Sequence, residues 1–190
     1  MAELELLTQE EQKSLLQLAR KSIEGKFLGQ PLPKLENPSP NLEKPMGAFV
    51  TLHKQGSLRG CIGRLIGDGP LWLTVALMAR EAAFHDPRFP PLEERELQWI
   101  DIEISVLSPL KKIQSIEEIE VGKHGLYLIK GPYRGVLLPQ VAVEYGWDRE
   151  TFLAHTARKA GLMPHEWQDS EIYIFSALVF GEKELGLLDN

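Results

Sequence analysis

The sequence predicts an α+β fold in which a mostly antiparallel sheet is packed with helices. Two observations support this class. Stretches that alternate apolar and polar residues are interspersed with stretches of helical periodicity. Several connections are short turns rather than the long crossovers that parallel strands require. We expect two unequal lobes, the larger over about residues 1–110 and 166–190 and the smaller over about 111–165.

The first predicted element is a helix with a marked start. Thr8 can cap it, and Glu11 three residues later completes a capping box. Apolar residues then recur at helical spacing as far as Ile23, and Gly25 and Gly29 are expected to end the helix. A proline-rich loop over 31–45 follows, which predicts an extended surface segment.

A strand hairpin and a buried helix come next. Residues 47–54 alternate as a strand does, Gln55-Gly56-Ser57 predicts the turn, and a second strand is expected over 58–64. Asp68 and Pro70 are expected to be the cap and first position of a helix that starts at Leu71. This helix is apolar nearly all round, which is typical of a buried helix.

The prolines of residues 86–91 cannot continue that helix and predict a rigid loop. Residues 100–108 then alternate between isoleucine or valine on one face and polar residues on the other. This pattern predicts a strand with one solvated face.

The second half predicts a hairpin near 125–138, followed by two short helices. Pro139 is expected to start the first helix. Asp148 is expected to cap the second, and Gly161 to end it. A final strand is predicted over 171–180, in the same sheet as the strands of the first half.

Composition restricts the function classes. The 190 residues include 21 Lys and Arg against 27 Asp and Glu, a formal net charge of −6. Binding to nucleic acid usually requires several cations at phosphates, so the net negative charge argues against nonspecific binding to DNA or RNA. Residues 44–67 nevertheless contain four cations and no acid. They form either an ordinary solvated strand face or a local field suited to a small anionic ligand.

The cysteine content and the hydropathy indicate a cytoplasmic protein. Cys61 is the only cysteine, so no internal disulfide is possible, and a free thiol fits a reducing compartment. The acidic N-terminal stretch lacks the basic segment of a signal peptide. No apolar run approaches the ~20 residues that a membrane helix needs. We therefore expect a soluble chain with no membrane association.

Cys61 is the candidate catalytic residue. It lies in the segment Leu-Arg-Gly-Cys-Ile-Gly, where Arg59 is two residues away and would project to the same side of an extended strand. A guanidinium beside a thiol favours the reactive thiolate. Gly60 and Gly63 allow a bulge or close approach of another backbone or a ligand. The alternative is a buried cysteine that packs as a small hydrophobe.

Asp86 and Arg88 are candidate ligand-binding residues, because the proline-braced loop would hold them rigidly. The alternative is a mutual salt bridge. We expect Arg59 and Arg88 to face one cleft within reach of Cys61, each free to hold a carboxylate or phosphate. His53, His124 and His155 are possible bases for the thiol.

The sequence has no paired Cys and His spacing and no nucleotide-binding or hydrolase motif, so no metal site is predicted and the cofactor stays unknown.

Several motifs together resemble the AMMECR family. Besides the cysteine segment at 58–63 they are GAFVTL at 47–52, DPRFPP at 86–91, ISVLSP at 104–109, GKHG at 122–125, LPQVA at 138–142, GWD at 146–148 and KAGL at 159–162. The resemblance spans about 47–180 and is weakest over residues 1–46, whose role it leaves open.

The resemblance implies an α+β fold of two unequal lobes but no settled activity. It also implies an association with Memo-like and radical-SAM proteins. Arg59, Cys61, Asp86, Arg88 and His124 fall on motif positions of the family, so we take Cys61 as catalytic and the other four as ligand-binding.

Three functions remain open at this stage. The first is an enzyme or enzyme component that uses Cys61. The second is a non-catalytic module that binds Memo-like or radical-SAM partners. The third is a regulatory protein associated with nucleic acid, which the net charge disfavours.

Overall fold

A computed structural model describes residues 7–188 of the chain, which divide into two compact units. Unit 1 comprises residues up to 107 together with those from 178 onward, and unit 2 comprises residues 108–177. Strand β7 (Glu171–Gly181) belongs to both units, because its last residues lie in unit 1. The two units are described separately below.

Unit 1 contains a hairpin, a third strand and two long helices. Its elements are α1 (Gln9–Phe27), α2 (Pro40–Glu43), β1 (Ala48–Lys54), β2 (Ser57–Arg64), α3 (Leu71–Phe84), the 3-10 helix η1 (Glu94–Trp99) and β3 (Ile100–Leu107). The strand order is β2-β1-β3, with β7 next to β3. The pairs β1–β2 and β1–β3 are antiparallel, as predicted.

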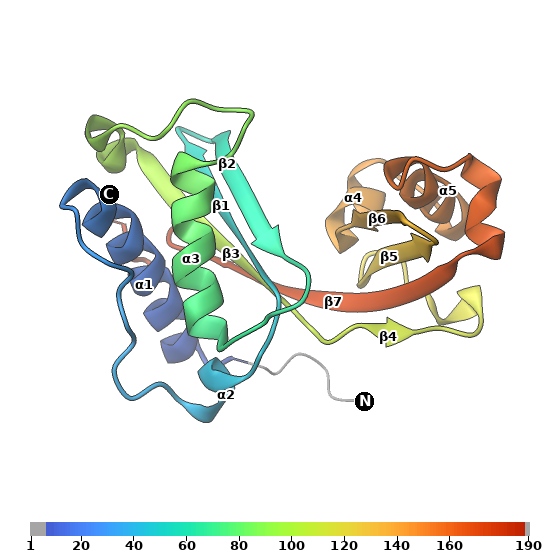
Figure 1. Cartoon of the computed structure of the whole chain (residues 1–190), viewed down its shortest axis with the longest axis horizontal. Coiled ribbons are helices and arrows are strands. Elements are labelled where there is room, and N and C mark those ends of the chain that lie inside the picture. The colour runs from blue at the N-terminus through green and yellow to red at the C-terminus, as the bar shows by residue number, and fades with distance from the viewer. Residues whose placement is uncertain (1–6, 189–190) are drawn as a thin grey trace. The chain divides into compact units, whose positions relative to one another are not determined.

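Helices α1 and α3 lie side by side on one face of these strands (Figure 1). The inward-facing residues of the strands are fully buried against the helices, among them Val50, Leu52, Ile102 and Ile104. The alternate residues of β1 and of the first half of β3, such as Thr51 and Glu103, are only partly buried. We call their side the second face of the sheet. It is the side on which polar side chains can stay accessible.

The start of α1 confirms the predicted capping box, since Thr8 accepts from the backbone of Glu11 and Glu11 accepts from the backbone of Thr8. The predicted cap of α3 is wrong. Pro70 occupies the N-cap position, and no side chain caps the helix. Asp68 instead accepts a hydrogen bond from Arg64 at 2.6 Å, because it lies two residues too early to reach the first turn.

The turn of the β1–β2 hairpin is also as predicted. Gln55 and Gly56 both have positive φ, at 51° and 84°. Two consecutive residues in this region form the turn whose twist matches that of paired strands.

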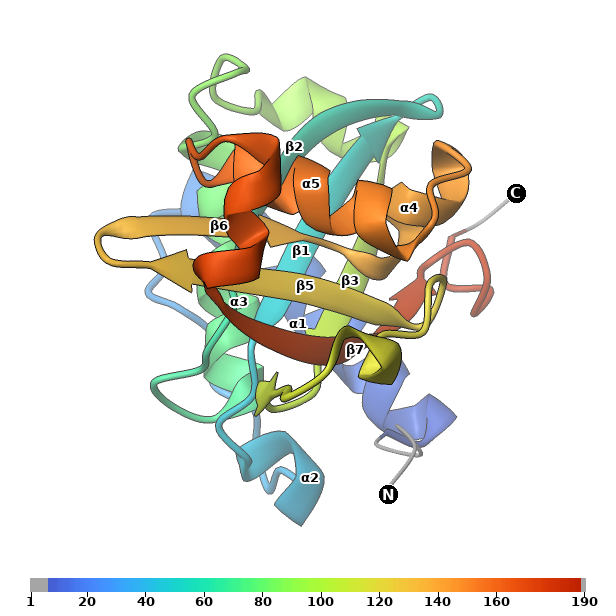
Figure 2. The same ribbon diagram turned by 90° about the vertical axis from the view of Figure 1, so that its right-hand side faces the viewer.

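Unit 2 is a second, smaller α+β assembly. Its elements are β4 (Lys111–Lys112), η2 (Ile116–Glu118), β5 (His124–Lys130), β6 (Tyr133–Leu137), α4 (Pro139–Glu144), α5 (Arg149–Lys159), η3 (Pro164–Asp169) and most of β7. The strand order is β4-β7-β5-β6, and the pairs are antiparallel. Helices α4 and α5 pack on β5 and β6 (Figure 2) and bury Phe152 and Leu153 against Leu126.

The predicted ends of α5 are confirmed, since Asp148 accepts from the backbone of Thr151 and Gly161 has a φ of 84°. The α+β class with mostly antiparallel strands is therefore confirmed, whereas the predicted lobe boundaries stay a prediction. No helix within residues 7–188 is long and apolar enough to span a membrane.

Candidate functional site

The segment that carries the cysteine forms β2, and a bulge interrupts its pairing with β1. Leu52 and His53 of β1 are opposed by three residues of β2, of which Arg59 is the unpaired one. A bulge resets the alternation of side chains along its strand. The prediction that Arg59 and Cys61 share one side does not hold, because it assumed regular alternation. The structure gives the two side chains different surroundings.

The two glycines around Cys61 are required by packing. A Cβ on Gly60 would lie 2.1 Å from the carbonyl oxygen of Ala82 in α3. A Cβ on Gly63 would lie 2.3 Å from the ring of Phe49. Both distances are far below van der Waals contact. Backbone and an aromatic ring occupy the space beside the two glycines, so neither glycine leaves room there for a ligand.

Asp86 and Arg88 form a clamp on the peptide groups of Cys61. The Asp86 Oδ2 accepts from the Cys61 N–H at 2.9 Å, and Nη2 of Arg88 donates to the Cys61 carbonyl oxygen at 3.3 Å. Arg88 also donates through Nε and Nη2 to both oxygens of Asp86. β2 lies at the end of the strand order, so the clamp satisfies backbone groups that no further strand reaches.

The clamp fixes the charge of its two side chains. Hydrogen bonds from Arg88 hold the pKa of Asp86 well below its usual range, although burial opposes the shift. The Asp86 side chain is 2% exposed, whereas that of Arg88 is 55% exposed. Asp86 is therefore a buried carboxylate, and its partner keeps one side in solvent.

Cys61 is a partly buried residue, and its thiol contacts Thr51 on the second face of the sheet. Thr51, which lies opposite Cys61 in the register, donates its hydroxyl to Sγ at 3.2 Å. Glu103 of β3 lies on the other side of Thr51, so a thiol, a hydroxyl and a carboxyl form one row across three strands. Burial raises the pKa of Glu103, although the charge of His53 opposes the shift.

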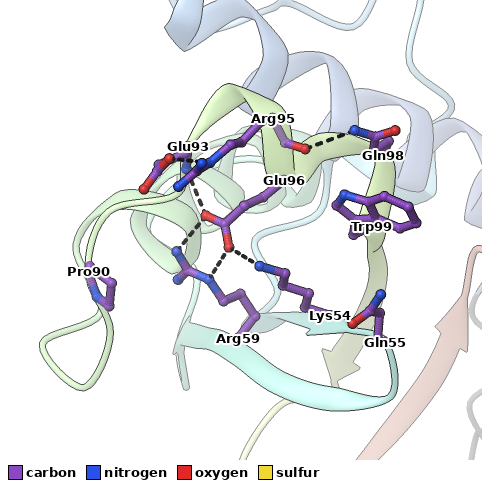
Figure 3. Close-up of a pocket in the computed structure, with 9 residues that line it drawn as sticks. All are labelled: Lys54, Gln55, Arg59, Pro90, Glu93, Arg95, Glu96, Gln98 and Trp99. Atoms are coloured by element: carbon purple, nitrogen blue, oxygen red, sulfur yellow. Dashed lines mark hydrogen bonds and ion pairs between the residues drawn. The ribbon is translucent and has the colours of Figure 1, made fainter.

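Arg59 belongs to a different feature, a pocket of about 450 Å³ between the β1–β2 hairpin and η1 (Figure 3). The residues that line it are Lys54, Gln55, Arg59, Pro90, Glu93, Arg95, Glu96, Gln98 and Trp99. Its floor is an ion cluster. Arg59 donates to both oxygens of Glu96 at 3.0 and 2.9 Å, and Lys54 donates to Oε1 at 2.8 Å.

These contacts fix the charge state of Glu96. Its pKa is lowered to about 2, chiefly by the hydrogen bonds from Arg59 and then by that from Lys54, against the opposing effect of burial. Glu96 is therefore ionised at neutral pH.

The two arginines are consequently not the free anion-holding groups that the sequence predicted. Arg59 grips Glu96, and Arg88 grips Asp86. The residues that line the Arg59 pocket include neither Cys61 nor Arg88. The prediction that Arg59, Cys61 and Arg88 line one cleft is therefore wrong, although Arg88 does contact the backbone of Cys61.

Two of the candidate bases lie in unit 2. His124 accepts a hydrogen bond at Nδ1 from the backbone of Glu120, which is a turn role, and burial lowers its pKa. His155 stacks on the ring of Trp147 at a centroid distance of 3.8 Å. His53 is the candidate base that lies near the row of Thr51 in unit 1, and its Nδ1 lies 3.8 Å from Asp101.

No group of three or more His, Cys, Asp or Glu side chains within residues 7–188 is arranged to hold a metal ion. Sequence reasoning missed Glu96 and Thr51. No motif marks Glu96. Thr51 becomes the neighbour of Cys61 only through the bulge, since a regular register would place it opposite Gly60.

Comparisons with known proteins identify relatives over nearly the whole chain. The profile of the AMMECR1 family matches residues 16–180. A protein of Methanosarcina barkeri is 42% identical over 189 residues, covering 94% of both chains. A protein of Methanopyrus kandleri is 44% identical and covers 95% of this chain and 92% of its own. A protein of Aquifex aeolicus is 40% identical and covers 90% of this chain and 93% of its own.

A solved structure is also similar. The crystal structure of an uncharacterized protein from Pyrococcus horikoshii superposes with a TM-score of 0.85 at 40% identity. It covers 94% of each chain.

Proposed function

The chain belongs to the AMMECR1 family, and from that premise we propose that it binds a ligand at unit 1, in a region centred on Cys61 and Arg59. The single free cysteine is the reason to place this function in the cytoplasm, and the family resemblance implies Memo-like and radical-SAM partners. In this function Cys61 is the reactive residue, and Arg59, Asp86 and Arg88 are the ligand-binding candidates. His124 lies in unit 2 and is left out of this proposal.

The observation that best supports this proposal is that the neighbours of Cys61 each have a structural role that the Cys61 thiol lacks. Gly60 and Gly63 meet neighbouring atoms that leave no space for a side chain, and Arg59 is held by Glu96. The Cys61 side chain has no such structural task. It is partly exposed, and its backbone is held on both sides by the clamp.

The surroundings of the thiol favour chemistry at sulfur. The Thr51 hydroxyl donates to Sγ, and a donated hydrogen bond stabilises a thiolate more than a thiol. The clamp fixes the backbone that carries the thiol, and the Thr51 hydroxyl contacts the sulfur itself, as a positioned nucleophile or adduct-forming group requires. Asp86 is buried and contributes by positioning Cys61. Arg88 also positions Cys61, and its exposed side can contact a ligand directly.

Alkylation by iodoacetamide tests the proposal. We expect the native protein to be modified at pH 7 faster than the same chain in denaturant, with Cys61→Ala as the control for unspecific labelling. A thiol that reacts only after unfolding would assign Cys61 to the structural class.

A second candidate function is a non-catalytic module that docks Memo-like or radical-SAM proteins. The observation in its favour is that Arg59, Asp86 and Arg88 are all engaged within the chain, so the cysteine segment is a rigid element. Capture of such a partner by the protein and by its Cys61→Ala variant with equal efficiency, together with an unreactive thiol, would favour this function. A role with nucleic acid has no comparable support, because the net charge is −6.

A further inference from the structure

The pocket between the β1–β2 hairpin and η1 has a donor-rich floor and an aromatic wall. We infer that it is a binding site for a singly charged carboxylate attached to a flat apolar body. The inference deepens the proposed function and rests on it in taking Arg59 as a ligand contact. It adds Lys54 and Trp99 as ligand contacts and Glu96 as the residue that positions the cations.

Glu96 is part of the floor rather than an acceptor for the ligand. Its Oε1 accepts from Nζ of Lys54 and Nε of Arg59. Its Oε2 accepts from Nη2 of Arg59 and from the backbone N–H of Glu93 at 2.9 Å. Four donors saturate the carboxylate, so it fixes the two cations and offers a ligand nothing further.

The cations keep donors to spare. Within residues 7–188, Nη1 of Arg59 donates to no residue and Nζ of Lys54 donates only to Glu96. Within the same residues, the only buried side-chain nitrogen or oxygen without a partner is Nε1 of Trp72, so Arg59 Nη1 is not sealed from solvent. In Figure 3 the Arg59 guanidinium and the Lys54 ammonium converge on Glu96 from different directions. Their remaining N–H groups can therefore hold an acceptor beside Glu96.

The local charge indicates which anion fits. Arg95 and Glu93 form an exposed pair that cancels at the rim. Lys54 and Arg59 against Glu96 leave one positive charge at the floor. A monoanion neutralises this charge, whereas a phosphate dianion would leave an uncompensated negative charge next to Glu96. The floor therefore favours a carboxylate over inorganic phosphate.

The wall indicates the rest of the ligand. Trp99 is 50% exposed, and a hydrogen bond from the Gln55 N–H to its carbonyl oxygen ties it to the hairpin turn. Figure 3 shows its indole beside Gln55 and Lys54. An exposed indole at a cation site offers a face for stacking. The volume of about 450 Å³ suits a small molecule or the last residue of a peptide.

Calorimetric titration with matched probes tests the inference. Benzoate is compared with benzamide, which has the same ring without the charge, and with inorganic phosphate. We expect benzoate to bind at least about tenfold more tightly than benzamide, since hydrogen bonds to a charged group are the stronger kind. A short peptide that ends in phenylalanine, as free acid and as amide, distinguishes a peptide C-terminus from a free aromatic acid.

The variants Lys54→Met and Trp99→Leu should each weaken benzoate binding by roughly fivefold or more. Lys159→Met, an exposed lysine of unit 2, is the control that should change nothing. Equal binding of benzoate and benzamide, tighter binding of phosphate, or unchanged affinity in both pocket variants would overturn the inference.

All titrations are repeated in Cys61→Ala, which separates the two proposals. If benzoate binds to this variant while the native thiol proves unreactive, the pocket inference is supported and the proposed role of Cys61 is refuted. If the thiol reacts but no carboxylate binds, the pocket inference fails alone.

Discussion

Replacing Glu96 by Gln removes one charge from a nearly buried cluster and should destabilise the protein by roughly 3 kcal/mol. The side chains of Arg59 and Glu96 are only 10% and 11% exposed, so the variant leaves Arg59 as an unpaired cation with little access to water. The amide keeps the volume of the carboxyl group. The loss therefore reports the charge rather than a cavity.

The pKa of Glu96 gives the same magnitude by a different route. It is lowered from 4.5 to about 2, and each pKa unit corresponds to about 1.4 kcal/mol, so ionisation in the native state contributes roughly 3 kcal/mol. Because the folded pKa lies below the unfolded one, this contribution is fully present above about pH 4.5 and is lost as the pH falls towards 2. Glu96→Gln lacks it throughout.

Urea denaturation of both proteins at several pH values measures the effect. At pH 7 we expect the loss stated above, or a decrease in Tm of roughly 6–12 °C for a chain of this size. The difference between the two proteins should shrink as the pH falls from about 4.5 to about 2. The control is Glu93→Gln in the same pocket. Glu93 forms an ion pair with Arg95, and the two side chains are 58% and 80% exposed. This control should cost less than about 1 kcal/mol. Equal losses in the two variants, or a difference that does not depend on pH, would refute the reasoning.

Three further predictions concern the cysteine strand and its row. Gly60→Ala should destabilise the protein by about 1–3 kcal/mol or more in chemical denaturation, because the new Cβ meets the carbonyl of Ala82. Thr51→Val should slow alkylation of Cys61 at pH 7 several-fold, whereas Thr51→Ser should keep the wild-type rate, because only valine removes the donor to sulfur. Glu103→Gln should raise stability at neutral pH. Burial raises the folded pKa of Glu103, so its unfavourable contribution appears as the pH rises through the unfolded pKa and should disappear in acid.

Matched variants separate these effects from general damage. Gly69→Ala is the control for Gly60, since its Cβ would meet nothing closer than 3.8 Å. A stability loss as large as that of Gly60→Ala would contradict the packing explanation. If Thr51→Val and Thr51→Ser alkylate at the same rate, the hydroxyl has no role at the thiol. A Glu103→Gln variant less stable than the wild type at pH 7 would show that the carboxylate is favourably paired.

Local patterns were sufficient for most of the secondary structure. The capping box of Thr8 and Glu11, the positive-φ turn at Gln55 and Gly56, and the cap at Asp148 all occur as predicted. Each depends on atoms within three or four residues of one another, so the sequence contains the whole interaction. The cap at Asp68 failed because Asp68 lies two residues before the N-cap position, and its carboxylate accepts from Arg64 instead.

The candidate site was predictable in its residues but not in their partners. Asp86 and Arg88 do form the salt bridge that was the alternative to ligand binding, and that pair also binds Cys61, 25 residues earlier. Arg59 was expected to be free, yet it binds Glu96, which no motif marks. A carboxylate that neutralises an arginine from another element leaves no periodic or local signal.

The sequence by itself determined the α+β class and the turn of the hairpin, because periodicity and short-range hydrogen bonds depend on neighbouring residues. Only the tertiary structure decided which charges meet. The bulge at Arg59 breaks the alternation on which the sequence prediction relied, and so separates Arg59 from Cys61. Two contacts between distant segments then replace the one expected cleft. Arg59 binds Glu96 at the floor of the pocket, and Asp86 binds the backbone of Cys61 elsewhere on β2.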